Sequence, residues 1–479
     1  MKKRKIMYSI LLCLFFSLFP QACSDEKATP ELVVRTESLD FDKEGGTKNF
    51  LVESNGNWTA SVSDNTWITA DPASGKATSK VLITVGPNTG ENAREGLVTF
   101  SLGSLQKTTK INQPGQGAAV PPDDNEGMVS DAKDLAAQLK IGWNLGNSLE
   151  ATSETNASET MWGNPKTSKR LIDAVKAAGF NAIRIPCAWS GYIENQETYK
   201  ISDAWLARVK EVVDYCIDNE MYTIINIHWD RGWLEENPFY AKQEEVNKKQ
   251  KALWTQIAGF FKDYDEHLLL AGTNEVHAGY GTPSAENIAV QSSYNQTFVD
   301  AVRATGGKNA WRNLVVQAYN TNSEYAIKYL KMPEDKAKKR LMVEVHYYDP
   351  WDFCGDESSS IYLWGKDYSG KGVSTWGQEA YANERFAGMK TNFVDKGIPV
   401  ILGEYGAILR SKLSDLEEQE HIQARNYYLN YITKTAQENG CIPFYWDNGN
   451  TGNNGFGLFN RSTGAQVYPD AIQAIVSAK

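Results

Sequence analysis

A regular alternation of short β-rich runs with helical segments, starting near residue 128, most constrains how this chain can fold. The helical stretches show one apolar face; after Ser202, a predicted helix N-cap, Leu206, Val209 and Val213 recur at helical spacing. Eight strands that alternate with helices predict a (β/α)8 TIM barrel over residues 128–479. The eight runs cover residues 141–145, 181–186, 222–228, 268–275, 313–319, 340–348, 398–406 and 441–449.

Each of these runs is apolar until its last residues and then ends in a polar or aromatic side chain. The interior of such a barrel prefers Val, Ile and Leu, and active sites lie at the carboxyl ends of the strands. The pattern therefore predicts a functional mouth at that end of the barrel. The side chains at the strand ends are Asn144, Arg184, His228, Asn274, Glu275, Tyr319, His346, Tyr348, Glu404 and Trp446.

Two of these residues are carboxylates, Glu275 after the fourth strand and Glu404 after the seventh. Strands four and seven lie across the mouth from each other, so the two side chains can approach within several ångströms. Retaining glycosidases need two carboxyl groups about 5–5.5 Å apart. A metal site that also uses His228 and His346 is the competing interpretation. Because Arg184 suits an anionic nucleophile and would repel a cation, no metal is expected.

The set of strand-end residues, in this order, resembles glycoside hydrolase family 5 of clan A, over residues 128–479. The motifs GWNLGNSLEA, NIHWD and HYYDPWDF resemble its subfamily 4, whose members are largely endo-glucanases and xyloglucanases. Two positions depart from the family pattern: the usual Asn-Glu-Pro ends in Val276, and a second His common after the third strand is Trp229.

The resemblance implies a role for each carboxylate and its neighbours. Glu275 would be the general acid/base and would need a raised pKa, so that it is protonated before bond cleavage. Glu404 would be the nucleophile, kept ionised by Arg184 and hydrogen-bonded by Tyr348. No cofactor is expected.

The remaining strand-end residues would bind substrate. Asn274 would bond the sugar 2-hydroxyl, His228 and His346 would hold substrate hydroxyls and the acid/base in place, and Trp446 would form the floor of a subsite. Three residues on mouth loops are candidates for more distant subsites, with loop packing as the alternative: Asn147, Trp233 and Trp351.

Residues 31–115 follow a different pattern. Short alternating stretches broken every few residues by Gly, Asn or Pro predict a small immunoglobulin-like all-β sandwich. The segment NGNWTASVSDNTWITADPASG and the later TTKINQPG resemble the BACON domain of carbohydrate-active proteins. Trp58 and Trp67 are expected to pack in its core, with glycan binding as the alternative, and the module is expected to act as a spacer.

The N-terminus carries the features of an export signal. Residues 1–22 combine a basic start with an apolar run from Ile6 to Phe19, too short to span a membrane. Cys23, followed by Ser-Asp-Glu, resembles the lipobox of bacterial surface lipoproteins, although Pro20 replaces the usual Leu. We expect an outer-membrane lipoprotein held by a lipid at Cys23, with free secretion as the alternative. Residues 116–127 are predicted to be an exposed linker.

The composition limits the kinds of partner that this chain can bind. A net charge of −10 argues against nucleic acid, whereas 14 Trp and 23 Tyr suit stacking on sugar rings. The four later cysteines lack metal-binding spacing and are expected to be buried free thiols.

The favoured function is an endo-acting, retaining β-1,4-glucanase, active on xyloglucan, and monomeric by default. The alternatives are activity on mixed-linkage glucan or cellulose derivatives, a β-mannanase, and a non-catalytic surface glycan-binding protein.

Overall fold

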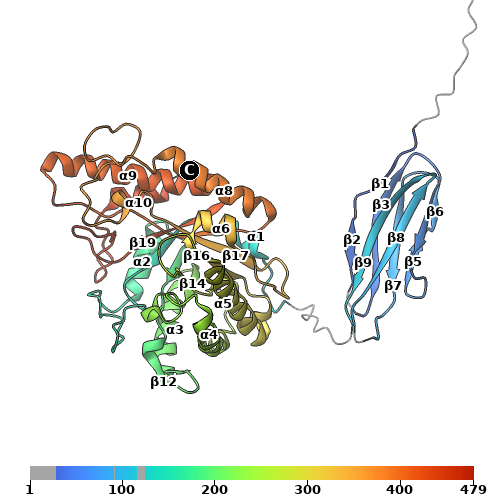
Figure 1. Cartoon of the computed structure of the whole chain (residues 1–479), viewed down its shortest axis with the longest axis horizontal. Helices are drawn as coiled ribbons and strands as arrows, with labels where there is room; N and C mark the ends of the chain where they lie inside the picture. Colours follow the sequence, from blue (N-terminus) through green and yellow to red (C-terminus); the bar gives the residue numbers. More distant parts are fainter. Residues whose placement is uncertain (1–28, 42, 91, 116–124, 479) are drawn as a thin grey trace, which may run out of the picture. The chain divides into compact units, whose positions relative to one another are not determined.

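The computed structural model describes residues 29–41, 43–90, 92–115 and 125–478. The chain divides into two compact units, with the division between Val120 and Pro121 (Figure 1). The predicted signal peptide, the predicted lipidation site Cys23 and most of the predicted linker lie outside the described residues.

The first unit is a pair of β-sheets. One sheet has the strand order β1-β3-β7-β5 and the other β2-β9-β8-β4-β6. The strands are β1 (Leu32–Val34), β2 (Ser38–Asp40), β3 (Gly46–Ser54), β4 (Trp58–Val62), β5 (Ile68–Asp71), β6 (Ser74–Gly75), β7 (Ser79–Val85), β8 (Arg94–Leu102) and β9 (Leu105–Gln113). In β7 and β8 buried and exposed residues alternate, as expected of sheets that bury one face.

Trp58 and Trp67 both belong to the core of this module. Their side chains are 1% and 9% exposed, and each indole N–H has a partner within the module: the Ala77 carbonyl for Trp58 and the Asp64 carboxylate for Trp67. The Arg94 guanidinium covers one face of Trp67, 4.1 Å from the ring centroid. The prediction that both residues pack in the core is confirmed, and neither indole face is free to stack on a sugar.

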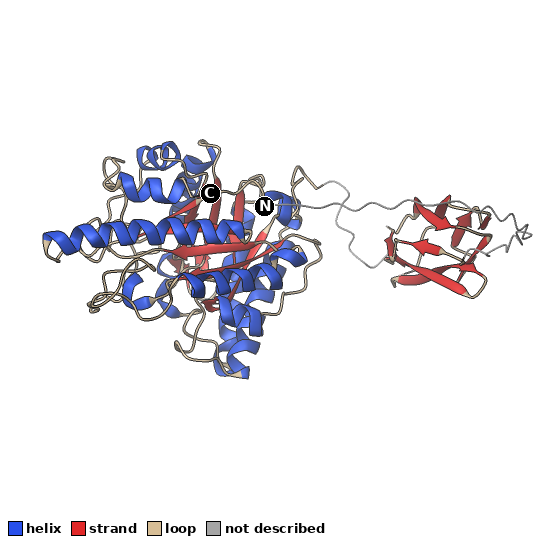
Figure 2. Cartoon of the chain, turned by 90° about the horizontal axis from the view of Figure 1, so that it is seen from above, coloured by secondary structure: helices blue, strands red, loops and turns tan. Residues whose placement is uncertain are grey.

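The second unit is built around a closed barrel of parallel strands, as predicted. Among the described residues the barrel order is β10-β11-β14-β15-β16-β17-β18-β19, and Figure 2 shows helices packed around these strands. The barrel strands are β10 (Gly142–Leu145), β11 (Ala182–Ile185), β14 (Tyr222–Asn226), β15 (Leu268–Ala271), β16 (Leu314–Asn322), β17 (Leu341–Tyr347), β18 (Val400–Tyr405) and β19 (Cys441–Asp447). A separate antiparallel pair, β12 (Ile193–Asn195) and β13 (Lys200–Ile201), follows β11.

Helices connect the barrel strands. The α-helices are α1 (Ala132–Ala136), α2 (Lys169–Ala177), α3 (Asp203–Ile217), α4 (Tyr240–Phe260), α5 (Ala285–Ala304), α6 (Ser323–Tyr329), α7 (Trp351–Cys354), α8 (Glu379–Asn392), α9 (Asp415–Glu438) and α10 (Pro469–Val476). Short 3₁₀ turns are η1 (Ser190–Tyr192), η2 (Asp230–Gly232), η3 (Gly307–Ala310) and η4 (Val394–Lys396). As predicted, Ser202 is the N-cap of α3. Among the described helices, none is both long and apolar enough to cross a membrane.

Strand alternation explains how the barrel is filled. Successive side chains of a strand point to opposite faces, so Met342 of β17 joins the core inside the barrel while Val343 and Val345 pack toward the helices. The inner apolar cluster continues with Ile224 of β14 and Ile401 of β18. Farther along each strand, the same inward-pointing series ends in polar residues.

Four cysteines among the described residues, Cys187, Cys216, Cys354 and Cys441, are free and buried, as expected. Burial raises the pKa of the Cys216 and Cys441 thiols to about 12. These thiols are therefore protonated and unreactive at neutral pH.

Candidate active site

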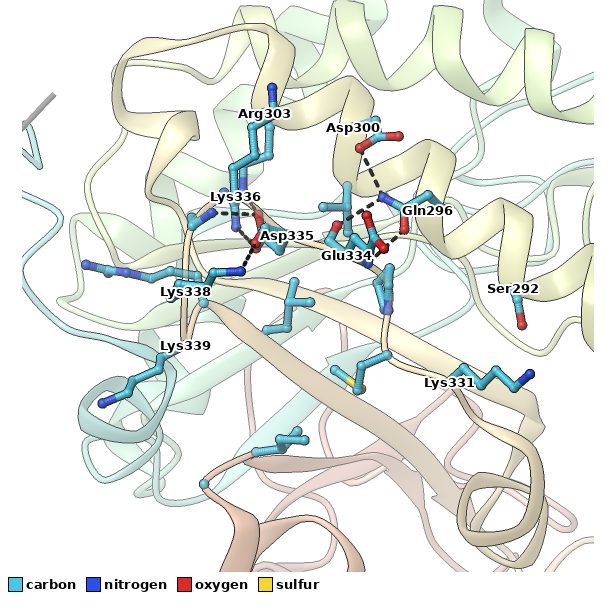
Figure 3. Close-up of a pocket in the computed structure, with 18 of the residues that line it drawn as sticks. Ser292, Gln296, Asp300, Arg303, Lys331, Glu334, Asp335, Lys336, Lys338 and Lys339 are labelled. Carbon is cyan, nitrogen blue, oxygen red and sulfur yellow. Dashed lines mark hydrogen bonds and ion pairs between the residues drawn. The ribbon is translucent and has the colours of Figure 1, made fainter. Parts of the chain in front are cut away.

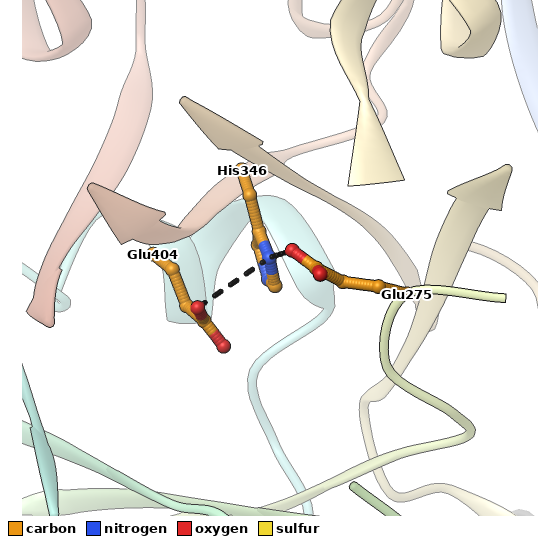
Figure 4. A group of neighbouring side chains, drawn as sticks. All are labelled: Glu275, His346 and Glu404. Atoms are coloured by element: carbon orange, nitrogen blue, oxygen red, sulfur yellow. Dashed lines mark hydrogen bonds and ion pairs between the residues drawn. The ribbon is translucent and has the colours of Figure 1, made fainter. Parts of the chain in front are cut away.

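The two carboxylates picked out from the sequence meet at the carboxyl end of the barrel. Glu275 follows β15 and Glu404 lies near the end of β18, with His346 of β17 between them (Figure 4). One ligand-type atom of each residue lies within 4.8 Å of those of the other two. The two carboxyl groups are thus about as close as a double-displacement mechanism requires.

Glu404 points inward because of a bulge in β18. Leu402 pairs with Val345 of β17, and Glu404 pairs with the very next residue, His346. Gly403 is therefore an extra residue in β18, and such a bulge re-aims the side chain that follows it. The Glu404 carboxylate then accepts hydrogen bonds from Arg184 Nη1 at 2.8 Å and from the Tyr348 hydroxyl at 3.0 Å.

Glu275 has a different set of partners. Its Oε1 lies 2.6 Å from His346 Nδ1 and 3.3 Å from the Thr321 hydroxyl, which donates to it. Thr321 and its neighbour Asn320 both have positive φ values, of 42° and 50°. Such backbone is uncommon for residues other than Gly and clusters at functional sites. The Glu275 side chain is 29% exposed, so it faces the open mouth.

Arg184 connects the two sides of the site. It is fully buried on β11, and its Nη1 also donates to Asn144 Oδ1 at 3.0 Å, while its Nη2 donates to Asn274 Oδ1 at 2.7 Å. A guanidinium presents its donors in a rigid fork. Arg184 therefore fixes Asn274 and Glu404 relative to each other.

His228, just after β14, and Trp446, on β19, stack on each other near the carboxyl ends of their strands. Their rings are stacked, with centroids 5.9 Å apart and planes 6° from parallel. Burial, together with Arg184 and His346, holds the pKa of His228 well below its ordinary value. His228 is therefore neutral at working pH, with one ring nitrogen able to accept a hydrogen bond.

The three predicted loop residues differ in their surroundings. Trp351 at the start of α7 is 53% exposed. Trp233 packs within its own loop: its N–H donates to Asp230, and the Lys249 ammonium covers the ring at 4.2 Å. Asn147 is half-buried in a turn with a φ of 57°. Of the three, Trp351 has an indole face open to a ligand.

Sequence reasoning missed two buried carboxyls beside the site. Glu344 is fully buried on β17, and the contact distance from its Oε1 to Arg184 Nε is 2.9 Å. Glu235, between η2 and α4, accepts hydrogen bonds from the Asn274 amide at 3.1 Å and the Glu275 backbone N–H at 3.2 Å. A carboxylate inside the apolar run that precedes His346 was a readable signal for Glu344. Nothing in the sequence indicates that Glu235 reaches the site.

The protonation of the site differs from the expectation. Burial raises the pKa of Glu404 against the pull of His346 and Arg184. Burial also acts on Glu275, but the hydrogen bond and charge of His346 outweigh it, so the pKa of Glu275 is lowered. The prediction of a raised pKa for Glu275 is therefore wrong, because the His346 imidazole lies 2.6 Å from its carboxylate.

The pKa values of the two buried carboxyls, Glu235 and Glu344, also depart from their ordinary values. Burial and the neighbouring Glu275 raise the pKa of Glu235 to about 8. Burial opposes ionisation of Glu344 too, but Arg184 and His346 outweigh it and leave the pKa of Glu344 lowered. Glu344 is thus an anion inside the barrel.

Glu275, His346 and Glu404 are also the group of metal-type ligands that the described part of the chain brings together. The Arg184 guanidinium lies 2.8 Å from Glu404 and Tyr348 donates to the same carboxylate. A cation at this position would face a fixed positive charge. The donor set therefore suits an anionic nucleophile better than a metal ion.

A large groove elsewhere on the barrel is separate from this site. It lies between α5 and the segment 331–341 that leads into β17 (Figure 3). This position is at the amino ends of the strands, opposite the mouth. Its buried pair, Arg303 and Asp335, lies 2.7 Å apart, and Arg303 also donates to backbone carbonyls, so both serve to hold the segment in place.

An eight-stranded parallel barrel with two close carboxylates at its mouth, one bonded by Arg and Tyr, is the arrangement that a retaining glycoside hydrolase requires. The chain matches the cellulase family, glycosyl hydrolase family 5, over residues 147–452, and a putative N-terminal binding domain, BACON, over residues 56–114. The chain belongs to glycosyl hydrolase family 5, as its sequence motifs predicted.

Relatives match both the whole chain and the barrel alone. The chain is 38% identical to the xyloglucan-specific endo-beta-1,4-glucanase BoGH5A of Bacteroides ovatus, over 99% of this chain and 96% of that protein. It is 39% identical to endoglucanase A of Paenibacillus barcinonensis, over 72% of this chain and 89% of that one.

Solved structures of family 5 enzymes are also similar to this chain. A Bacteroides ovatus family 5 xyloglucanase in complex with a XXXG heptasaccharide matches with a TM-score of 0.73 and 36% identity, over 94% of this chain and 99% of that one. A family 5 xyloglucanase from Paenibacillus pabuli in complex with ligand matches with a TM-score of 0.68 and 39% identity, over 72% of this chain and 99% of that one.

Proposed function

We propose that this protein is an endo-acting β-1,4-glucanase that hydrolyses xyloglucan with retention of anomeric configuration. The proposal rests on the pair Glu275 and Glu404, whose carboxylate oxygens lie within 4.8 Å of each other. Of these two carboxylates, only Glu404 accepts hydrogen bonds from Arg184 and Tyr348. The guanidinium of Arg184 is always charged, so its bond to Glu404 favours the anionic form of that carboxylate and marks it as the nucleophile.

The proposed reaction has two displacements. Glu404 attacks the anomeric carbon and forms a glycosyl–enzyme bond while Glu275 donates a proton to the departing glycosidic oxygen. Glu275, now a carboxylate, then takes a proton from water as that water attacks the anomeric carbon and releases Glu404. Both steps pass through an oxocarbenium-like transition state.

Asn274 is positioned to recognise the sugar at this transition state. Its Oδ1 accepts from Arg184 and its Nδ2 donates to Glu235, which fixes the orientation of the amide. The second N–H of Nδ2 remains for the sugar 2-hydroxyl. His228 and Trp446 would line the subsite beside it, and Trp351 a more distant one.

The choice of xyloglucan rests on similarity along the whole chain to a xyloglucan-specific relative, the N-terminal module included. Mixed-linkage β-glucan, cellulose derivatives and mannan are the competing substrates. Initial rates of reducing-sugar release on equal masses of xyloglucan, barley β-glucan, carboxymethylcellulose and mannan test the choice. The highest kcat/KM on xyloglucan supports it, and a preference for mannan or the absence of hydrolysis overturns it.

We further propose that the mature protein is a monomer tethered to the outer surface of the cell by a lipid on Cys23. The support is the sequence of residues 1–26, which resembles a lipoprotein signal. Metabolic labelling with a fatty acid should mark the wild-type protein and not Cys23→Ala, and the purified soluble chain should elute at the mass of one copy.

A further inference from the structure

The Glu344 carboxylate takes no part in the mechanism above, yet it contacts two residues of the site, Arg184 and His346. It is two residues before His346 on β17, so both side chains point into the barrel. Its carboxylate meets Arg184 Nε at 2.9 Å and His346 Nε2 at 3.2 Å, and accepts a hydrogen bond from Gln317 Nε2 at 2.6 Å. A fully buried charge with three polar partners is costly to place and calls for a role.

The neighbouring strand leaves room for this carboxylate. A Cβ atom on Gly403, the bulge residue of β18, would lie 2.1 Å from Glu344 Oε1. Gly403 therefore has two effects: as the extra residue of the bulge it turns Glu404 inward, and its lack of a side chain leaves room for the Glu344 carboxylate.

His346 connects Glu344 to the reacting groups. One ring nitrogen, Nε2, faces Glu344, and the other, Nδ1, lies 2.6 Å from Glu275 Oε1 and 3.7 Å from Glu404 Oε2. Because Nε2 faces a permanent anion, it carries a proton. Any second proton on the ring lies on Nδ1 and points at Glu275.

We propose that Glu344 is a positioning residue that keeps His346 protonated on both nitrogens, so that the ring stores the proton that Glu275 delivers to the leaving group. The inference rests on the proposed glycosidase mechanism and adds a proton source to it.

The proton balance is simple. Before bond cleavage the proton on His346 Nδ1 passes to Glu275 Oε1, which leaves a neutral imidazole and a carboxylic acid. Glu275 then donates that proton to the glycosidic oxygen as the bond to the anomeric carbon breaks. In the second step Glu275 takes a proton from the attacking water and returns it to His346 Nδ1, which restores the starting state.

The charges around His346 agree with this arrangement. Burial lowers the pKa of His346, but Glu404, Glu275 and Glu344 outweigh it and raise the pKa to about 10. The other charged or titratable groups that face this cluster are Arg184 from β11, neutral His228 after β14, Tyr348 after β17 and Glu235, which bonds to the backbone of Glu275. None of these replaces the anion at Nε2.

The test is the pH profile of Glu344→Gln, which keeps the shape of the side chain and removes its charge. Loss of a negative charge next to the ring weakens its hold on the stored proton. The basic limb of kcat/KM on the polysaccharide should therefore move to lower pH by about one unit or more. On 2,4-dinitrophenyl β-cellotrioside, whose leaving group needs no proton, the same variant should show no such shift.

A matched control is Gln317→Met, which removes the neutral partner of Glu344 and leaves every charge in place. It should lower activity without moving the basic limb. A basic limb of Glu344→Gln that coincides with that of the wild type, or an equal shift on both substrates, overturns the proposal. Wild-type protein inactive on both substrates would instead overturn the glycosidase function, and this inference with it.

If Glu344→Gln does not fold, the protonation state of His346 in the wild-type protein still tests the proposal. In ¹⁵N-histidine NMR at pH 8, His346 should give the two similar ring-nitrogen shifts of an imidazolium, and the signal is assigned by its loss in His346→Asn. The widely split shifts of a neutral ring at that pH overturn the proposal.

Discussion

Arg184 is the residue on which the geometry of the site depends most. Its three nitrogens meet Glu404, Asn144, Asn274 and Glu344, and its side chain is fully buried. Removing one partner of a buried charge pair leaves the other unpaired, at a cost of roughly 3–5 kcal/mol. A single Arg on β11 therefore organises residues that lie on or directly after four other strands, β10, β15, β17 and β18.

Much of this set could be predicted from the sequence because it lies at the ends of apolar strands. A search for polar residues at the ends of apolar strands finds those that lie on a strand or directly after it, such as Arg184, Glu275 and Glu404. It does not find Glu235, which reaches the site from a loop whose path depends on tertiary packing. It also gives no protonation state, because the 2.6 Å contact of Glu275 with His346 is a product of the fold.

The roles of the two carboxylates can be separated by azide rescue. Glu404→Gly and Glu275→Gly should each lose on the order of 10⁴-fold in activity on the polysaccharide. With an activated aryl cello-oligoside and azide, Glu404→Gly should give the α-glycosyl azide, because azide takes the place of the missing nucleophile. Glu275→Gly should give the β-azide, because azide attacks the glycosyl–enzyme. The opposite pairing would exchange the two assignments.

At the scale of elements, strands β17 and β18 determine the chemistry through their register. The sequence predicts both strands, but it does not reveal the shift that pairs His346 with Glu404. A strict alternation along β18 would place Gly403 and Tyr405 on one face and Glu404 on the other. The bulge, which only the pairing pattern reveals, aims Glu404 inward.

Gly403→Ala should therefore damage both stability and activity. The new Cβ would lie 2.1 Å from the Glu344 carboxylate, which is held by Arg184, His346 and Gln317 and cannot move freely. Overpacking of this kind costs about 1–3 kcal/mol. Urea unfolding should show that loss together with a decrease in kcat.

A matched control is Gly259→Ala in α4, where an added Cβ meets nothing within 4 Å. It should leave activity unchanged and raise stability slightly, since Ala favours a helix. Equal behaviour of the two variants would argue against the packing of Gly403 on Glu344.

At the scale of the whole molecule, the chain divides into a β-module and a barrel, each with its own core. The alternating pattern of residues 31–115 was sufficient to predict a sandwich. The order of strands within each sheet was not predictable, because it depends on which turns bring distant strands together.

Deleting residues 24–127 should leave kcat and KM on soluble substrates within about twofold. The predicted sugar-binding candidates of the module, Trp58 and Trp67, are buried, and the barrel keeps Ser130, whose hydroxyl bonds Glu266. Affinity electrophoresis of residues 24–127 in gels with xyloglucan, β-glucan or mannan provides the direct check. Retardation in any gel would show a binding module, which could raise apparent affinity for long chains by about 100-fold.

We propose that Glu404 and Glu275 act as a nucleophile and an acid/base in a double displacement. Proton NMR of the first reducing ends released from xyloglucan tests it most directly, before mutarotation mixes the anomers. Two carboxyls within 4.8 Å leave no room for an attacking water between Glu404 and the anomeric carbon. The β-anomer should appear first, and an initial α-anomer would contradict a double displacement.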